Sequence, residues 1–159
     1  MVSDRQGLFK DVVGRFATGV TIVTAMEDDQ PVGFTCQSFT PLSLEPQMIA
    51  IAPAKSSTSW PKIARAGSFC VNILSDRQSN LCRSFAVSGG NKFAGVQWRV
   101  GVTGAPVLEL SLAVVECDLE AIHDAGDHEL VTGRVVAMEV GAGMPLLFYR
   151  SAFCSISYG

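Results

Sequence analysis

The sequence predicts a mainly β domain, built as an antiparallel barrel with peripheral helices. Short segments rich in β-branched and apolar residues recur between turn signals, whereas only two or three segments have helical spacing. Many strands with so few helices favour an antiparallel barrel over βαβ repeats. No G-x-G-x-x-G motif opens a βαβ unit and no phosphate loop of the G-x-x-x-x-G-K-[ST] type occurs, so nucleotide binding in the Rossmann or P-loop manner is not expected. The 159 residues are expected to form one domain, residues 1–159.

Three helices are predicted. The first covers residues 7–17, where apolar side chains recur with helical spacing, and it is expected to pack on the core. The second covers residues 60–66, with a proline in its first turn and a glycine directly after it. The third follows a capping box formed by Ser75 and Gln78 and extends to about Phe85.

The strands are predicted from β-branched, apolar or alternating segments. They cover residues 20–25, 32–37, 47–52, 69–74, 114–122, 130–140 and 145–150. In segment 114–122 apolar residues alternate with acidic ones, which indicates a strand with one exposed face. Polar turns at 27–31 and 124–127 and a glycine-containing loop at 88–90 separate the elements.

Composition limits the classes of function. Hydrophobic residues make up 48% of the chain and charged residues 17%, which is apolar for a soluble monomer and suggests a subunit interface. The net charge is −3 and no basic stripe is present, which argues against a nucleic-acid partner. The apolar stretches are far shorter than the roughly 20 residues that span a membrane, so no membrane association is expected. No secretion signal is recognisable at the start of the chain.

Cysteine and histidine usage gives two further expectations. The five cysteines form no C-x-x-C pair and are interpreted as small buried apolar residues in a reducing cytoplasm, where we expect the protein to reside. The chain has only two histidines, His123 and His128, without metal-ligand spacing, so no metal site is predicted.

Two clusters of small polar residues flank the strand predicted at 47–52. The first is Thr35, Cys36, Gln37 and Ser38, and the second is Ala54, Lys55, Ser56, Ser57 and Thr58. Small hydroxyl residues let a backbone approach a flat polar ligand closely, and a lysine beside hydroxyls suits a phosphate group. The alternative is that both clusters are ordinary turn residues.

Eight segments in chain order resemble one known family. They are FKDVVGRFATGVTIVTA, VGFTCQSFTPLSLEPQMIAI, AKSSTSWPKI, FCVNIL, FAGVQW, GAPVLE, GDH and PLLFYRSAF. Together they resemble the short-chain flavin reductases, the small reductase partners of two-component flavin-dependent monooxygenases. This resemblance implies a split β-barrel of the Greek-key, FMN-binding type and a homodimer.

The resemblance also implies which residues bind the cofactors. The segment facing the flavin ring and ribityl chain would be Thr35, Cys36, Gln37 and Ser38. The opposite side, toward the phosphate, would be formed by Pro53, Ala54, Lys55 and Ser56. The phosphate or adenylate end would be approached by Arg83, Ser84, Phe85, Lys92 and Phe93, and the nicotinamide by His128. Tyr149 would lie near the flavin or the nicotinamide. The alternatives are solvated side chains for Arg83, Lys92 and His128, and core packing for Tyr149.

The implied activity is NAD(P)H-dependent reduction of FMN or FAD, with the reduced flavin supplied to a separate oxygenase. No catalytic side chain is expected, since hydride passes between the two cofactors while the protein supplies geometry and excludes water. No arginine pair marks a 2′-phosphate site, which favours NADH over NADPH. The alternatives are a non-catalytic flavin-binding protein and an oxidase of the pyridoxamine-phosphate type on the same barrel.

Overall fold

Strands dominate the computed structural model, which describes residues 2–158, with side chains described from residue 4. The helical elements are α1 (Val2–Val13), α2 (Trp60–Ala66), η1 (Asp76–Gln78) and α3 (Ser79–Ala86). The strands before α3 are β1 (Thr18–Gly19), β2 (Thr21–Glu27), β3 (Gln30–Cys36), β4 (Phe39–Leu44), β5 (Gln47–Ile51) and β6 (Ser68–Ile73). The later strands are β7 (Trp98–Val100), β8 (Pro106–Leu108), β9 (Ala113–Ala125), β10 (His128–Val140), β11 (Leu147–Tyr149) and β12 (Ala152–Cys154).

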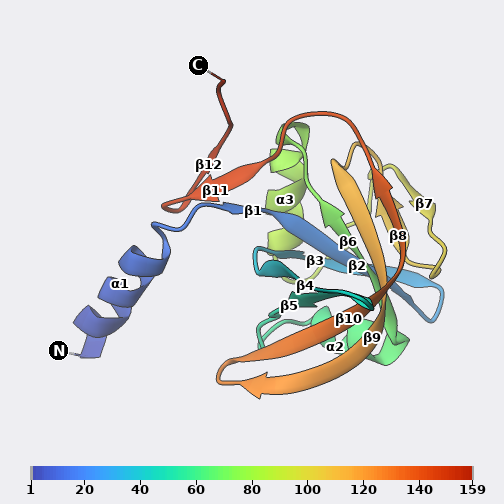
Figure 1. Ribbon diagram of the computed structural model, residues 1–159, viewed down its shortest axis with the longest axis horizontal. Coiled ribbons are helices and arrows are strands. Elements are labelled where there is room, and N and C mark those ends of the chain that lie inside the picture. Colours follow the sequence, from blue (N-terminus) through green and yellow to red (C-terminus); the bar gives the residue numbers. More distant parts are fainter. Residues whose placement is uncertain (1, 159) are drawn as a thin grey trace.

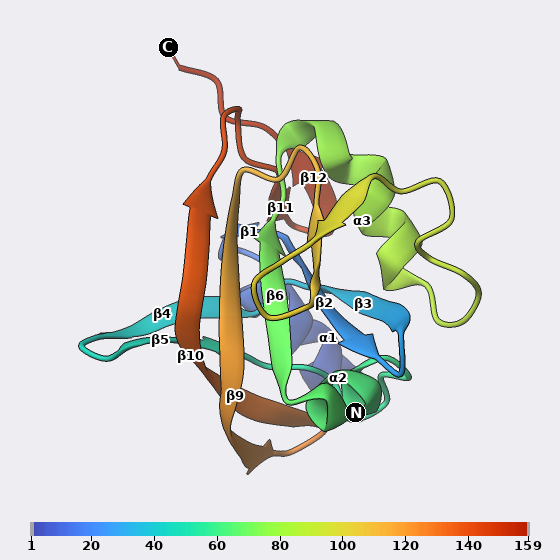
Figure 2. The ribbon, with the colours of Figure 1, turned by 90° about the vertical axis from the view of Figure 1, so that its right-hand side faces the viewer.

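Seven strands form one antiparallel sheet in the order β3-β2-β6-β9-β10-β5-β4 (Figures 1 and 2). The two edge strands, β3 and β4, follow one another in sequence with only Gln37 and Ser38 between them, so the sheet curls until its edges meet. The long β9–β10 pair contains two register shifts, and such bulges let a strand bend around a barrel. This architecture confirms the predicted mainly β barrel with peripheral helices.

Two apolar clusters form most of the core and position the helices. The first packs α2 against the barrel through Ile63, Phe69 and Ile51. The second holds α3 through Phe85, with Ile22 and Leu74 among its neighbours. Gly33 on β3 permits this close approach, because a Cβ there would lie 2.9 Å from the Phe85 ring. Core packing therefore sets the two helices on either side of β3.

Most predicted elements are present. The helix at 60–66 ends at Gly67, which has a φ of 77°, the left-handed conformation typical of a helix C-terminus. The predicted capping box is also formed, since the Ser75 amide donates to Gln78 Oε1 at 2.8 Å. The prediction missed β1, β4, β7, β8 and β12. Of these, β4 contains Pro41 and lies at a sheet edge, the position where a strand tolerates proline.

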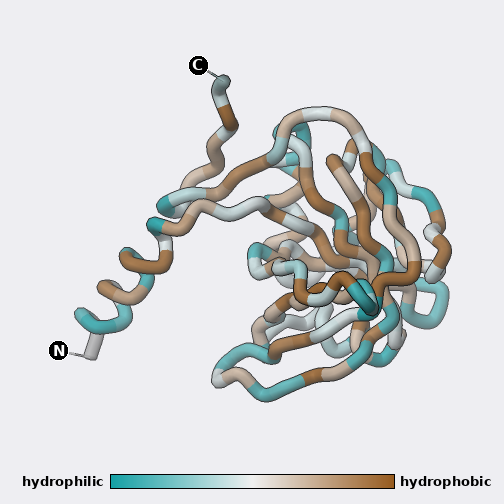
Figure 3. Tube along the Cα trace, viewed as in Figure 1, coloured by the Kyte–Doolittle hydropathy of each residue, from teal (hydrophilic) through white to brown (hydrophobic). Residues whose placement is uncertain are grey.

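The prediction for the first helix was wrong in its end and in its packing. The helix ends at Val13, and its apolar side chains are exposed in the protomer: Leu8 is 62% exposed, Phe9 65% and Val12 61%. The reason is that the chain turns after α1 and enters β1, which pairs with β11 at the periphery and leaves α1 projecting away from the barrel (Figure 1). Figure 3 shows hydrophobic residues along this projecting helix.

Across residues 2–158, no helix combines the length and the apolar character needed to cross a membrane.

Candidate functional site

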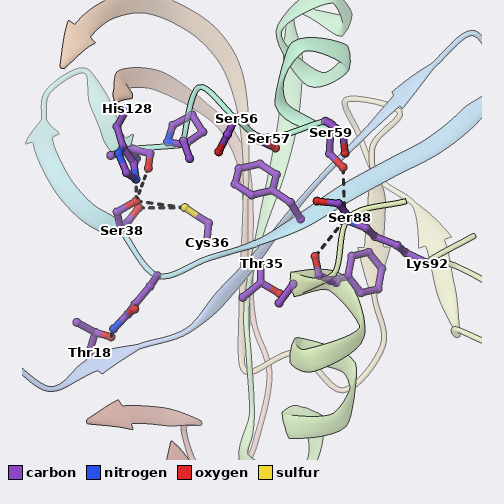
Figure 4. A pocket seen from close by; sticks show the side chains of 18 of the residues that line it. Thr18, Thr35, Cys36, Ser38, Ser56, Ser57, Ser59, Ser88, Lys92 and His128 are labelled. Carbon is purple, nitrogen blue, oxygen red and sulfur yellow. Dashed lines mark hydrogen bonds between the residues drawn. The ribbon is translucent and has the colours of Figure 1, made fainter. Parts of the chain in front are cut away.

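A cavity of about 570 Å³, here called the main cavity, opens where β3 meets β4 (Figure 4). Its walls come from the β3–β4 junction, the loop between β5 and α2, the end of α3 and the start of β10. The lining residues are Val13, Thr18, Phe34, Thr35, Cys36, Gln37, Ser38, Ala52, Pro53, Ala54, Ser56, Ser57, Thr58, Ser59, Phe85, Ala86, Ser88, Lys92 and His128. Both small polar clusters of the sequence therefore face one cavity.

The side chains of the first cluster fix the shape of the β3–β4 junction. Thr35 Oγ1 donates a hydrogen bond to the Cys82 carbonyl at 2.6 Å, which ties β3 to α3. Ser38 Oγ donates to the Ala52 carbonyl at 3.1 Å and accepts from the Ala52 amide at 2.9 Å. These hydroxyls are engaged within the protein, so they hold the cavity wall in place.

Cys36 is a neutral thiol in this wall. Its side chain is buried, and burial raises the pKa of the thiol above its ordinary value, although hydrogen bonds to Ser38 oppose the shift. The Cys36 sulfur lies 3.3 Å from Ser38 Oγ. A protonated thiol is a poor nucleophile, so Cys36 contributes packing and a weak donor to the cavity.

The loop between β5 and α2 is held by the start of β10. The Lys55 amide donates to the Asp127 carbonyl at 2.9 Å, and the Glu129 amide donates to the Pro53 carbonyl at 2.9 Å. At the far end of the loop, Trp60 Nε1 donates to Glu129 Oε2 at 2.6 Å. This pairing presents a row of hydroxyls from residues 56–59 to the main cavity.

Lys55 itself points away from the main cavity. Its ammonium group forms an ion pair with Asp124 at the tip of the β9–β10 hairpin, and it is not one of the lining residues. Two acidic residues stand at that tip, so the lysine has a counter-charge outside the cavity. The hydroxyls of the second cluster reach the cavity, and its lysine does not.

Lys92 is the lysine that lines the main cavity. Its Nζ donates to the carbonyl oxygens of Phe85, at 3.1 Å, and Gly33, at 3.2 Å, and lies 3.5 Å from Ser59 Oγ. No ion pair among residues 4–158 includes this ammonium group. Burial lowers the pKa of Lys92, the sign of a charge that has lost water without gaining a carboxylate. An anionic ligand group beside Lys92 would compensate for this loss.

His128 stands at the first position of β10, on the opposite side of the loop. Its Nδ1 lies 2.7 Å from Asp127 Oδ1, and its side chain is 46% exposed. The hydrogen bond with His128 is the main cause that lowers the pKa of Asp127, so the carboxylate is charged and accepts from Nδ1–H. In the neutral imidazole this leaves Nε2 as a hydrogen-bond acceptor.

The remaining residues expected at the site lie at its edge or outside it. Phe85 lines the main cavity, whereas Phe93 is buried behind it with a ring centroid 4.9 Å from that of Phe85. Arg83 stacks over the Phe153 ring at 4.8 Å, and Ser84 donates to the Asn80 carbonyl on α3.

Tyr149 lies on β11, is 39% exposed and does not line the main cavity. Sequence reasoning missed several lining residues that carry no local signal, among them Val13, Thr18, Phe34, Ser59 and Ser88. Ser88 stands beside Gly89 and Gly90 in the loop that the sequence predicts at 88–90.

The chemistry of the main cavity suits a flat ligand with an anionic end. Hydroxyl, amide and apolar groups line it, one cation stands in its wall, and none of its lining residues is acidic. Its volume falls within the range of about 300–1,000 Å³ typical of small-molecule sites. Within the described residues, no cluster of histidine, cysteine or acidic side chains could hold a metal ion. Fold and site together define a β-barrel protein with a cavity that suits a flat ligand carrying an anionic group.

Comparison with known proteins identifies the family. The model of the flavin reductase like domain matches residues 13–157. HsaB, the reductase subunit of a flavin-dependent monooxygenase from Rhodococcus jostii, is 47% identical over 149 residues, covering 93% of this chain and 76% of that protein. SmoA of Agrobacterium fabrum, named FMN reductase (NADH), is 39% identical over 91% of this chain and 83% of that protein. The chain therefore belongs to the flavin reductase-like family, as the sequence resemblance indicated.

A solved structure supports the same assignment. The crystal structure of nitrilotriacetate monooxygenase component B from Mycobacterium thermoresistibile superposes with a TM-score of 0.96 at 41% identity. The match covers 99% of this chain and 89% of that chain.

Proposed function

We propose that this protein is an NADH-dependent flavin reductase that supplies reduced flavin to a separate oxygenase. The observation that carries the proposal is the main cavity, where hydroxyls, an uncompensated ammonium group and an apolar wall converge on the barrel of a flavin reductase-like chain. HsaB is named as a reductase subunit, which supports the separate oxygenase partner.

Bound flavin would supply the hydride-accepting ring, and the residues of the main cavity divide its binding between them. The segment Thr35–Ser38 would face the ring with its backbone, because its side chains are largely engaged within the protein. The hydroxyls of residues 56–59 and the ammonium group of Lys92 would hold the phosphate end. The imidazole Nε2 of His128 would accept a hydrogen bond from the carboxamide of the nicotinamide.

The reaction requires little acid–base chemistry from the protein. The nicotinamide must stack on the flavin at close range in a site from which water is excluded. A rigid wall serves this purpose, and the hydrogen bonds of Thr35, Ser38 and Glu129 fix three parts of that wall. Either FMN or FAD suits the main cavity, and NADH is favoured over NADPH.

The proposal includes a homodimer. Large apolar side chains are exposed on α1, in the segment after it, on the β4–β5 hairpin and on β10, and a protein rarely leaves so many without a partner surface. They include Leu8, Phe9, Val12, Phe16, Leu42, Leu44, Val136, Met138 and Val140. A second copy of the chain would cover them and explain the apolar composition. All five cysteines are free, which supports a reducing compartment such as the cytoplasm.

Anaerobic mixing tests the reaction. The purified protein with a tenfold excess of FMN or FAD should bleach the flavin absorbance on addition of NADH, with many turnovers per protomer. A non-catalytic flavin-binding protein would shift the flavin spectrum and leave the flavin oxidised. An oxidase of the pyridoxamine-phosphate type would instead oxidise pyridoxine phosphate in air. Failure to reduce either flavin would refute the proposed function.

A further inference from the structure

A small apolar cavity, here called the aromatic pocket, lies between α3 and the β11–β12 hairpin. It has a volume of about 190 Å³ and is lined by Val20, Thr35, Gln37, Cys82, Arg83, Ala86, Phe148 and Phe153. Thr35, Gln37 and Ala86 also line the main cavity, so the two cavities are neighbours that share part of a wall. The other lining residues face the aromatic pocket alone, and the roles proposed above for flavin and nicotinamide do not use it.

Apolar groups form the interior of the aromatic pocket. Phe148 on β11 and Phe153 on β12 are a cross-strand pair, and their rings meet edge to face with centroids 5.6 Å apart. Val20 and Cys82 are each 3% exposed, and burial raises the pKa of the Cys82 thiol, which keeps it neutral. The Thr35 hydroxyl is engaged by the Cys82 carbonyl. Such a surface of rings, aliphatic carbon and a neutral thiol suits a flat apolar group.

Arg83 supplies a positive charge to this otherwise apolar surface. Its guanidinium carbon lies 4.8 Å from the centre of the Phe153 ring, and its side chain donates to Asn80 Oδ1 at 3.2 Å. None of the ion pairs among the described side chains includes Arg83, and none of the residues lining the pocket is acidic. A guanidinium that stacks on a ring through its face keeps its edge for a carboxylate, which it binds with two parallel hydrogen bonds.

The size of the aromatic pocket matches one six-membered ring with a short substituent. An apolar cavity of about 150 Å³ is large enough to bind benzene. The aromatic pocket exceeds this volume, at about 190 Å³. The oxidised nicotinamide ring is of similar size, but its positive charge would be repelled by Arg83, and the reduced ring offers the guanidinium no charge. An anionic aromatic ring therefore fits the shape and the charge together.

On this basis we propose that the aromatic pocket binds a small aromatic carboxylate, with its ring against Phe148 and Phe153 and its carboxylate on the guanidinium of Arg83. This site is separate from those proposed for the flavin and the nicotinamide, so the acid binds while flavin occupies the main cavity. The bound acid would then lie next to Thr35 and Gln37, in the segment proposed to face the flavin ring.

Ligand-observed NMR tests the site with benzoate as the probe. Benzoate should bind the full-length protein with a dissociation constant of about 1 mM or lower, both without FMN and with FMN at saturation. Arg83→Gln keeps a long polar side chain without the charge, and it should weaken benzoate binding about five- to tenfold. Benzamide has the same ring without the charge, so it should bind the wild-type protein more weakly than benzoate and be little affected by this variant.

Two further variants separate the ring contact from general effects. Phe153→Leu keeps an apolar side chain without the ring, and it should weaken benzoate and benzamide binding alike, by about threefold. The matched control for the charge is Arg77→Gln on η1, an equal change outside both cavities, which should leave benzoate affinity unchanged.

Several outcomes would overturn the inference. Displacement of benzoate by FMN or by NAD⁺ would place the probe in a cofactor site. Equal benzoate affinity of the wild-type protein and Arg83→Gln would remove the guanidinium from the site. Binding that appears only when Leu8→Gln and Val12→Gln are combined would show that a second copy of the chain fills the aromatic pocket. None of these measurements requires NADH oxidation, so failure of the inference is distinct from failure of the proposed function.

Discussion

A double substitution on α1 should separate the proposed dimer into protomers. Leu8 and Val12 lie one turn apart on the helix, and both are more than half exposed in the protomer. Replacing both with glutamine keeps the helical propensity, because glutamine is a good helix former. The change removes apolar surface from α1 while leaving the barrel and the main cavity untouched.

The expected magnitude follows from the exposed fractions. Full burial of a leucine or valine side chain is worth about 1.5–3 kcal/mol. With roughly 60% of each side chain still to be buried, the pair contributes about 2.5 kcal/mol in each protomer. An isologous dimer contains the pair twice, so the dissociation constant should rise about a thousandfold or more.

Sedimentation velocity over a dilution series measures this effect. The wild-type protein should sediment near 34 kDa, twice the 16.9 kDa of one chain, and the variant should shift toward the monomer at micromolar concentration. The control is Val102→Gln, an 80% exposed apolar residue in the turn between β7 and β8. A variant that stays dimeric at every concentration would refute the role of α1, and a monomeric wild-type protein would refute the dimer itself.

Three further predictions concern single residues. His128→Ala should raise the KM for NADH or slow flavin reduction by about ten- to a hundredfold in stopped-flow measurements, which corresponds to about 1.4–2.7 kcal/mol of transition-state stabilisation. A flavin titration of the same variant should show unchanged flavin affinity. Cys36 should resist a thiol reagent at pH 8 while the exposed Cys154 reacts, because burial raises the Cys36 pKa above 9.0. Folding keeps this thiol protonated, so the free energy of unfolding should fall as the pH rises above 9.0, where the Cys36 thiol of the unfolded chain ionises. Labelling of Cys36 as early as Cys154 would contradict the predicted resistance of Cys36 to the reagent. Glu116→Gln should cost about 1–3 kcal/mol in thermal or denaturant unfolding. The buried carboxylate accepts two backbone amides and one hydroxyl from the turn at 102–103, whereas Glu120→Gln on the surface should cost little.

Local patterns were sufficient to predict much of the barrel. The β-branched segment at 20–25 predicts a strand and the capping box at Ser75 predicts a helix start, each from only a few neighbouring residues. Both are present in the structure. The helical spacing of Leu8 and Val12 also predicted a helix correctly. This spacing could not predict which surface the helix covers, because the same amphipathic pattern suits a helix that packs on its own barrel and a helix that packs on a second protomer.

The site was harder to predict because its charges are arranged by long-range pairing. Lys55 stands among hydroxyls in the sequence, yet the lysine in the wall of the main cavity is Lys92, which follows α3. The acidic residue that engages Lys55, Asp124, lies on a hairpin far along the chain. Nothing near residue 55 signals this partner, so a local pattern cannot show which lysine lines the main cavity.

The start of β10 connects two parts of the site, the loop after β5 that is proposed for the phosphate and His128 that is proposed for the nicotinamide. Its backbone pairs with the loop after β5 at Pro53, and the Glu129 carboxylate receives the indole N–H of Trp60 at the end of that loop. The neighbouring residue, His128, points its imidazole at the same cavity. The loop proposed for the phosphate and the histidine proposed for the nicotinamide are thus fixed by one pair of adjacent residues. A shift of this strand end would move both together, so under the proposed roles the flavin and the nicotinamide would keep their relative positions for hydride transfer.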